Sequence, residues 1–202
     1  MKKALLIASM AMLAMAGTTQ AAGNAEAGKT KSAVCAACHG VDGNSGANPL
    51  WPKLAGQHPG YIIQQLQDFK AGKRTDTMMA PMAAPLSEED MADLAAYFNG
   101  QQRTIGEADA DQVAEGEKLY RAGNAVSGVS ACSACHGPAG SGNPLSNFPS
   151  LSGQGAEYVA KALKDFRSGT RNNDAAGMMQ DVASRLTDAE IDAVAQYVQG
   201  LH

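Results

Sequence analysis

The chain has 202 residues, of which 16 are Lys or Arg and 20 are Asp or Glu, so its formal net charge is −4. A length of this order fits one or two domains, and the acidic balance argues against a nucleic-acid partner, which requires a basic surface. Hydrophobic residues reach 45% but aromatic residues only 5%. Such small side chains fill a core poorly, which favours a bound group as part of it.

Residues 1–21 predict a secretory signal peptide that is removed on export. Lys2 and Lys3 form a positive start, an apolar run covers residues 4–16, and Thr19 and Ala21 are small residues placed for cleavage. The apolar run is too short for a transmembrane helix, and no later stretch approaches the ~18 apolar residues of a membrane span. We therefore expect an exported, acidic mature protein.

All four cysteines lie in two copies of the pattern C-x-x-C-H, which are Cys35-Ala-Ala-Cys38-His39 and Cys132-Ser-Ala-Cys135-His136. This pattern is the attachment signature of c-type haem. The two thiols add to the two vinyl groups of one porphyrin, and the adjacent histidine faces the iron. A redox dithiol or a zinc site is the alternative, but zinc requires further ligands and only His58 and His202 remain. The sequence predicts two covalently bound haems.

The two motifs belong to a tandem repeat of a unit of under 100 residues. Cys35 and Cys132 are 97 positions apart, and this offset relates many further pairs, including Pro52/Pro149, Gln57/Gln154, Tyr61/Tyr158 and Arg74/Arg171. The offset later becomes 100, as in Met79/Met179 and Tyr97/Tyr197, because three residues are inserted near residues 172–177. We place the join in the polar stretch 101–110, which gives two domains over residues 22–106 and 107–202.

The spacing of apolar residues predicts that each unit is helical, and no segment alternates apolar and polar residues with the period of a strand. Capping-box patterns begin the last helix of each copy, at Ser87 and Thr187, and Gly100 and Gly200 follow as helix stops. The loops after the motifs are rich in Gly and Pro, as expected of backbone that wraps a flat ring. The predicted helices are residues 25–37, 60–71 and 88–99 in the first copy, and residues 112–122, 156–168 and 188–199 in the second.

The sixth iron ligand decides between an electron carrier and an enzyme. The candidates are two matched methionine pairs, Met78/Met178 and Met79/Met179, whereas Met82 corresponds to Val182. The repeat alone does not separate the two pairs. A methionine on each iron favours a carrier over a dihaem peroxidase, which needs an open iron face and a distal acid or base. A haem subunit of a dehydrogenase and a gas sensor are the further alternatives.

Several other repeated residues have simpler interpretations. Tyr61 and Tyr158 are expected to pack in the haem pockets. Arg74 and Arg171 are interpreted as solvated surface charges, with pairing to haem propionates as the alternative. His58 has no histidine counterpart in the second copy and is interpreted as a loop residue.

The sequence resembles the dihaem cytochrome c4 family. The resemblance covers the mature chain and includes the runs at residues 38–44, 52–57 and 197–202. It implies two class I cytochrome c domains packed about a pseudo-twofold axis, with the haem propionate edges close together. It also implies iron ligation by His39 with Met79 and by His136 with Met179.

The same resemblance implies a function. Members are periplasmic, often membrane-associated one-electron carriers toward terminal oxidases. The expected partners are therefore a respiratory donor complex and a terminal oxidase, with peripheral membrane association. No small-molecule substrate is expected, and the chain is expected not to be an enzyme.

Overall fold

The computed structural model describes residues 23–46 and 48–202, so the predicted signal peptide lies outside the described residues. Within these ranges every regular element is a helix, and β contacts are limited to the isolated bridges Asn124–Val129 and Asn143–Phe148. No helix in this part of the chain is long and apolar enough to cross a membrane. The predicted all-α fold is confirmed.

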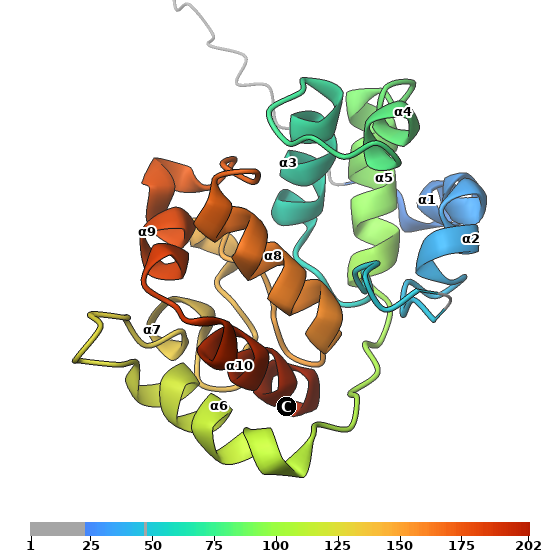
Figure 1. The fold of residues 1–202 in the computed structure, drawn as a ribbon. Coiled ribbons are helices and arrows are strands. Elements are labelled where there is room, and N and C mark those ends of the chain that lie inside the picture. The colour runs from blue at the N-terminus through green and yellow to red at the C-terminus, as the bar shows by residue number, and fades with distance from the viewer. Residues whose placement is uncertain (1–22, 47) are drawn as a thin grey trace, which may run out of the picture.

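Figure 1 shows two helical units that follow each other along the chain. The five α-helices of the first unit have counterparts in the same order in the second, which confirms the tandem repeat. The first unit comprises α1 (Ala25–Lys31), the 3-10 helix η1 (Ser32–Val34), α2 (Ala36–His39), α3 (Pro59–Lys70), α4 (Met79–Ala83) and α5 (Glu88–Asn99). The second comprises α6 (Ala110–Ala122), α7 (Ser133–His136), η2 (Pro144–Ser146), α8 (Ala156–Ser168), η3 (Ala175–Gly177), α9 (Met178–Ser184) and α10 (Asp188–Gly200).

In each unit the first helix crosses the last helix at a glycine. A Cβ atom at Gly28 of α1 would lie 2.0 Å from the carbonyl oxygen of Asp93 in α5. A Cβ atom at Gly116 of α6 would lie 2.2 Å from the carbonyl oxygen of Ala193 in α10. Because no real Cβ atom approaches an oxygen so closely, only glycine allows the two helix backbones to touch.

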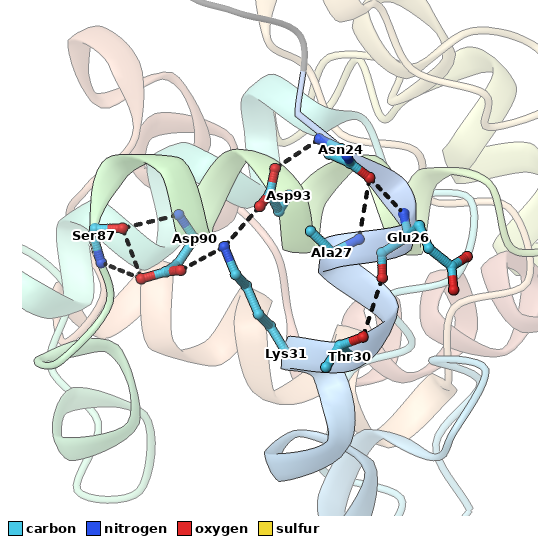
Figure 2. Close-up of polar contacts among 8 residues, drawn as sticks. All are labelled: Asn24, Glu26, Ala27, Thr30, Lys31, Ser87, Asp90 and Asp93. Carbon is cyan, nitrogen blue, oxygen red and sulfur yellow. Dashed lines mark hydrogen bonds and ion pairs between the residues drawn. The ribbon is translucent and has the colours of Figure 1, made fainter.

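Polar contacts reinforce this crossing in the first unit. Lys31 of α1 lies 2.7 Å from the carboxylates of both Asp90 and Asp93, and the Asn24 N–H donates to Asp93 at 2.6 Å (Figure 2). The hydrogen bonds from Lys31 lower the pKa of both carboxyl groups, and they raise the pKa of Lys31 itself. Since Ala193 stands at the position of Asp93 in α10, this network is specific to the first unit.

The last helix of each unit begins with the capping box that the sequence predicts. The Ser87 hydroxyl accepts from the Asp90 N–H at 3.1 Å, and the Asp90 carboxylate accepts from the Ser87 N–H at 2.9 Å. Thr187 and Glu190 exchange the same two bonds at the start of α10. These caps satisfy N–H groups that the first turn of a helix leaves without partners.

The predicted first helix over residues 25–37 is wrong in one respect, because it is not continuous. The α1 helix ends at Lys31, a 3-10 turn follows, and the chain restarts as α2. The Ser32 hydroxyl donates to the Lys29 carbonyl, and the Cys35 N–H donates to the Ser32 carbonyl, both across three residues. These tighter bonds place the cysteine motif on a separate short helix. The end predicted at Gln199 is also one residue early, since α10 includes Gly200.

The two units pack against each other through matched residues. Arg171 donates to the Tyr61 hydroxyl at 2.8 Å, and Arg74 donates to the Tyr158 hydroxyl at 3.3 Å. Because both residue pairs are counterparts in the repeat, the contact is mirrored, as in a twofold-symmetric dimer. Arg171 is 7% exposed, so its interpretation as a solvated charge is wrong. The guanidinium is instead buried against the phenol of the other unit.

The connection between the units also contributes to their interface. Arg103 lies in the helix-free stretch between α5 and α6, and its side chain contacts both units. Its Nε donates to the Ala55 carbonyl at 2.7 Å, and its Nη1 donates to the carbonyls of Ser150 and Ser152 at 3.2 and 3.0 Å. The linker therefore packs between the units.

Candidate functional site

In the first unit the cysteine motif forms the short helix α2 and the residue before it. Cys35 is the N-cap of α2 and His39 is its last residue, and the His39 N–H donates to the Cys35 carbonyl at 2.9 Å. Gly40 then turns the chain with φ of 78°, a conformation that favours glycine. His39 is buried, and both cysteines are half-buried. One helical turn thus brings together the two thiols and the imidazole.

The second motif repeats this geometry in α7. Cys132 is the N-cap, His136 is the last residue, and Gly137 follows with φ of 79°. His136 is buried to the same extent as its counterpart, Cys132 is half-buried and Cys135 is exposed. The longer loop that precedes this motif is closed by the two backbone bonds of the Asn124–Val129 bridge.

Both motif histidines present one ring nitrogen to a backbone carbonyl. The Pro52 carbonyl accepts from His39 Nδ1 at 2.9 Å, and the Pro149 carbonyl accepts from His136 Nδ1 at 3.0 Å. Burial lowers the pKa of both imidazoles, and the carbonyl bond only partly offsets this effect. Each histidine is therefore neutral at physiological pH, with its proton on Nδ1 and its Nε2 lone pair free to bind a metal.

The cysteines do not have the properties of a redox dithiol. None of the four is joined to another cysteine by a disulfide. Burial raises the pKa of Cys35, and it raises the pKa of Cys132 to about 11. Reactive C-x-x-C pairs have lowered thiol pKa values instead. Within residues 23–46 and 48–202, no group of three or more His, Cys, Asp or Glu side chains is arranged to hold a metal ion. The raised thiol pKa values therefore disfavour a redox dithiol.

The first methionine pair lies at the start of α4. Met79 is the first residue of the helix and is half-buried, whereas Met78 precedes it and is 59% exposed. The Asp76 carboxylate accepts from the N–H groups of both methionines at 2.9 Å. Asp76 thus holds the segment that carries the candidate ligand.

The second methionine pair has the same difference in exposure, although the backbone that precedes it has a different conformation. Met179 is half-buried and Met178 is 42% exposed. The Asp174 carboxylate accepts from the Met179 N–H at 2.7 Å. The inserted residues form the 3-10 turn η3, in which Ala176 has φ of 54°, an uncommon value for a residue with a side chain. Sequence reasoning missed Asp76 and Asp174, although an aspartate precedes both methionine pairs.

The interface supplies a further observation that bears on a bound cofactor. Arg103 is half-buried and has no carboxylate partner, and its buried Nη2 atom has no hydrogen-bond partner. Burial lowers its pKa to about 10. A buried donor nitrogen without a hydrogen-bond partner is costly, and an anion beside it would satisfy it. A haem propionate is an anion that this donor fits. The thiols for covalent attachment, the neutral imidazoles for iron ligation and this donor for a propionate therefore all fit a bound haem.

The comparisons with known proteins agree with this chemistry. The family model described as Cytochrome c matches residues 25–102 and 113–202. The chain is 49% identical over 199 residues to cytochrome c4 of Pseudomonas aeruginosa, covering 98% of each chain. It is 53% identical over 181 residues to cytochrome c4 of Thiocapsa roseopersicina, covering 89% of this chain and 93% of that one.

A solved structure has the same architecture. The crystal structure of reduced recombinant cytochrome c4 from Pseudomonas stutzeri superposes with a TM-score of 0.86 at 49% identity, over 90% of this chain and 100% of that one. The two matched domains account for the two haem c sites. The chain therefore belongs to the cytochrome c4 family, and it is a dihaem electron carrier rather than an enzyme.

Proposed function

We propose that each iron is held between the motif histidine and the second methionine of its unit. The pairs are His39 with Met79, and His136 with Met179. The covalent attachment residues are Cys35 and Cys38 for the first haem, and Cys132 and Cys135 for the second.

The difference in burial within each methionine pair carries this proposal. In both units the first methionine is exposed and the second is half-buried. A ligand to a buried cofactor has to be directed inward, so the second methionine fits this role. The aspartate bonds to the backbone of Met79 and Met179 support the proposal, because they fix the start of each ligand segment.

The ligand set determines the kind of electron transfer. Haem supplies a one-electron change between Fe(III) and Fe(II), and a thioether ligand raises its potential and closes the sixth position to exogenous ligands. The residues of this chain keep the imidazoles neutral and bury them. We propose that the protein passes single electrons between components of the respiratory chain, from a donor complex toward a terminal oxidase.

Location and domain limits are part of the same proposal. Residues 1–21 would act as a cleavable signal peptide and deliver the protein to the periplasm. Residues 22–106 and 107–202 would then form one haem domain each, which agrees with the two matched ranges and with the helix-free stretch between α5 and α6. Peripheral association with the membrane would bring the carrier close to its partners.

The electronic spectrum of the oxidised protein tests the ligand assignment. The weak far-red charge-transfer band of His/Met ligation should be present for both haems. Met79→Ala should remove the contribution of one haem and let that iron bind added small ligands, whereas the matched Met78→Ala should leave the spectrum unchanged. The reverse result would assign Met78 as the ligand, and high-spin iron in the unmodified protein would contradict His/Met ligation altogether.

A further inference from the structure

A peptide group links each motif histidine to a glutamine of the opposite unit. The carbonyl that accepts from a histidine belongs to a proline, and the next residue supplies the N–H of the same peptide group. In both units this N–H donates to a glutamine side chain across the interface. The two glutamines, Gln57 and Gln154, are counterparts in the repeat.

In the first unit the peptide group joins Pro52 to Lys53. Its carbonyl accepts from His39 Nδ1 at 2.9 Å, and its N–H donates to Gln154 Oε1 at 2.8 Å. The Gln154 Nε2 also donates to the Lys53 carbonyl at 3.0 Å. The glutamine therefore holds Lys53 by both its backbone groups.

The second unit mirrors this arrangement with the roles exchanged. The carbonyl of the Pro149–Ser150 peptide accepts from His136 Nδ1 at 3.0 Å, and its N–H donates to Gln57 Oε1 at 2.9 Å. The Gln57 Nε2 donates to the Ser150 carbonyl at 2.9 Å. Each unit thus supplies the glutamine that holds the histidine-bonding loop of the other.

Burial and a further hydrogen bond also hold each glutamine in place. Gln57 is 5% exposed and Gln154 is 4% exposed. Each side-chain oxygen also accepts from the N–H of the residue that follows it, His58 at 2.9 Å and Gly155 at 3.1 Å. These residues are the N-caps of α3 and α8, so the amide is held at the start of a helix that faces the interface.

The geometry of a peptide group makes this link directional. A trans peptide is planar, and its N–H and C=O point in opposite directions, so holding the N–H also orients the carbonyl. Hydrogen bonds at both ends of one peptide polarise each other. The acceptor on a ligating imidazole fixes the ring orientation and raises the basicity of the nitrogen that binds the metal.

We propose that Gln57 and Gln154 are positioning residues that tune the haem of the opposite unit. Gln154 would set the hydrogen bond of His39, and Gln57 would set that of His136. Domain packing is thereby coupled to the reduction potential of each haem. This inference rests on the proposed roles of His39 and His136 as iron ligands.

The test uses the full-length dihaem protein with Gln57→Leu and Gln154→Leu. NMR of the reduced protein reports the Nδ1–H resonance of each histidine, and a redox titration followed by NMR reports each haem separately. Gln154→Leu should move the His39 resonance and change the oxidation equilibrium of the first haem severalfold. A tenfold change corresponds to 59 mV for a one-electron couple. Gln57→Leu should act in the same way on His136 and the second haem.

Gln64→Leu is the matched control, because it makes the same substitution and removes a cross-interface hydrogen bond, from Asn147, that does not involve either peptide group. It should leave both histidine resonances in place. If either Leu variant does not fold, Gln57→Asn and Gln154→Asn provide shortened amides that cannot span the same distance. Amide hydrogen exchange at Lys53 and Ser150 adds a second readout, since these N–H groups should lose protection in the variants.

The decisive result is that each glutamine variant changes the histidine resonance and the haem of the opposite unit, and not those of its own unit. The inference fails if each variant changes the haem of its own unit, if neither haem responds, or if the control has the same effect. If the unmodified reduced protein shows no protected Nδ1–H resonances from His39 and His136, the ligand assignment itself fails. If those resonances are present but do not respond to the opposite glutamine, only this inference is overturned.

Discussion

The glycine at each helix crossing gives a sharp test of how the two units are built. Gly28→Ala would place a methyl group 2.0 Å from the Asp93 carbonyl oxygen and 2.9 Å from the Tyr97 Cβ atom. Both neighbours belong to the rigid α5 helix, so neither can move away as a flexible side-chain tip could. The two helices must separate to accommodate the methyl group.

The size of the effect follows from two opposing terms. Alanine in place of glycine favours a helix by about 1 kcal/mol. Overpacking a well-packed contact costs about 1–3 kcal/mol and occasionally more, and a clash with backbone belongs at the upper end of this range. We expect a net loss of about 2 kcal/mol, which lowers the melting temperature of a unit of this size by roughly 10 °C.

Thermal denaturation of the dihaem protein, followed by circular dichroism, measures this loss. Gly116→Ala should have a similar effect, since its Cβ atom would lie 2.2 Å from the Ala193 carbonyl oxygen. Gly100→Ala is the control, because its nearest neighbours would lie 3.5 and 3.7 Å away at ordinary contact distance. If Gly28→Ala melts at the same temperature as the unmodified protein, the close helix crossing is incorrect.

Two further predictions concern the first unit. Replacing Cys35 and Cys38 by serine should leave this unit unfolded rather than only haem-free, because a small unit poor in aromatic residues depends on the porphyrin for its core; retained helicity with cooperative melting would contradict this. Asp93→Asn should lower the melting temperature at neutral pH by a few degrees, because the hydrogen bond from Lys31 lowers the pKa of Asp93 in the folded state. The stabilisation is fully present above the ordinary pKa of 3.8 and is lost as the pH falls through the lower folded value. Melting curves recorded across this range should therefore converge for the two proteins at low pH, and a gap that stays constant with pH would refute the explanation.

The helices and the haem motifs could be predicted because their signals are local. The period of apolar residues, the capping boxes at Ser87 and Thr187 and the spacing of the cysteines each depend on a few neighbouring positions. The middle helix of the second unit was predicted at the bounds that α8 has. The break after Lys31 was missed because it depends on 3-10 bonds that leave no pattern in the sequence.

The repeat predicted which residue types form the candidate site, but it did not predict which methionine of each pair belongs to it. Met78 and Met79 share the register of the repeat with their counterparts, so the repeat could not separate them. The structure separates them by burial, which depends on how the α4 segment packs on its unit. The two histidines could be named as candidate ligands because they adjoin the cysteines.

The interface was the least predictable part of the molecule. The repeat identified Tyr61 and Arg171 as matched residues, but it gave no sign that they meet across the two units. A charge in a helical protein is most often solvated, and only the packing of one unit on the other buries Arg171. Gln57 and Gln154 were noted as repeated residues without any role, because their partners lie about 100 positions away in the chain.

The two units share a fold but differ around their cofactor sites. The second unit has an extra turn before its methionines and a longer loop before its cysteines. Residues 22–106 carry seven Lys or Arg and eight Asp or Glu, whereas residues 107–202 carry seven and twelve. Because negative charge stabilises oxidised iron, we expect this imbalance to contribute to a difference between the two potentials.

A potentiometric titration of the intact protein, followed by its visible spectrum, tests the central claim most directly. The claim is that one chain carries two His/Met-ligated haems in similar but unequal pockets. The titration should resolve two one-electron steps at different potentials, with low-spin iron throughout and loss of the far-red band on reduction. A single potential that fits both haems, or a high-spin component in the oxidised protein, would contradict the account.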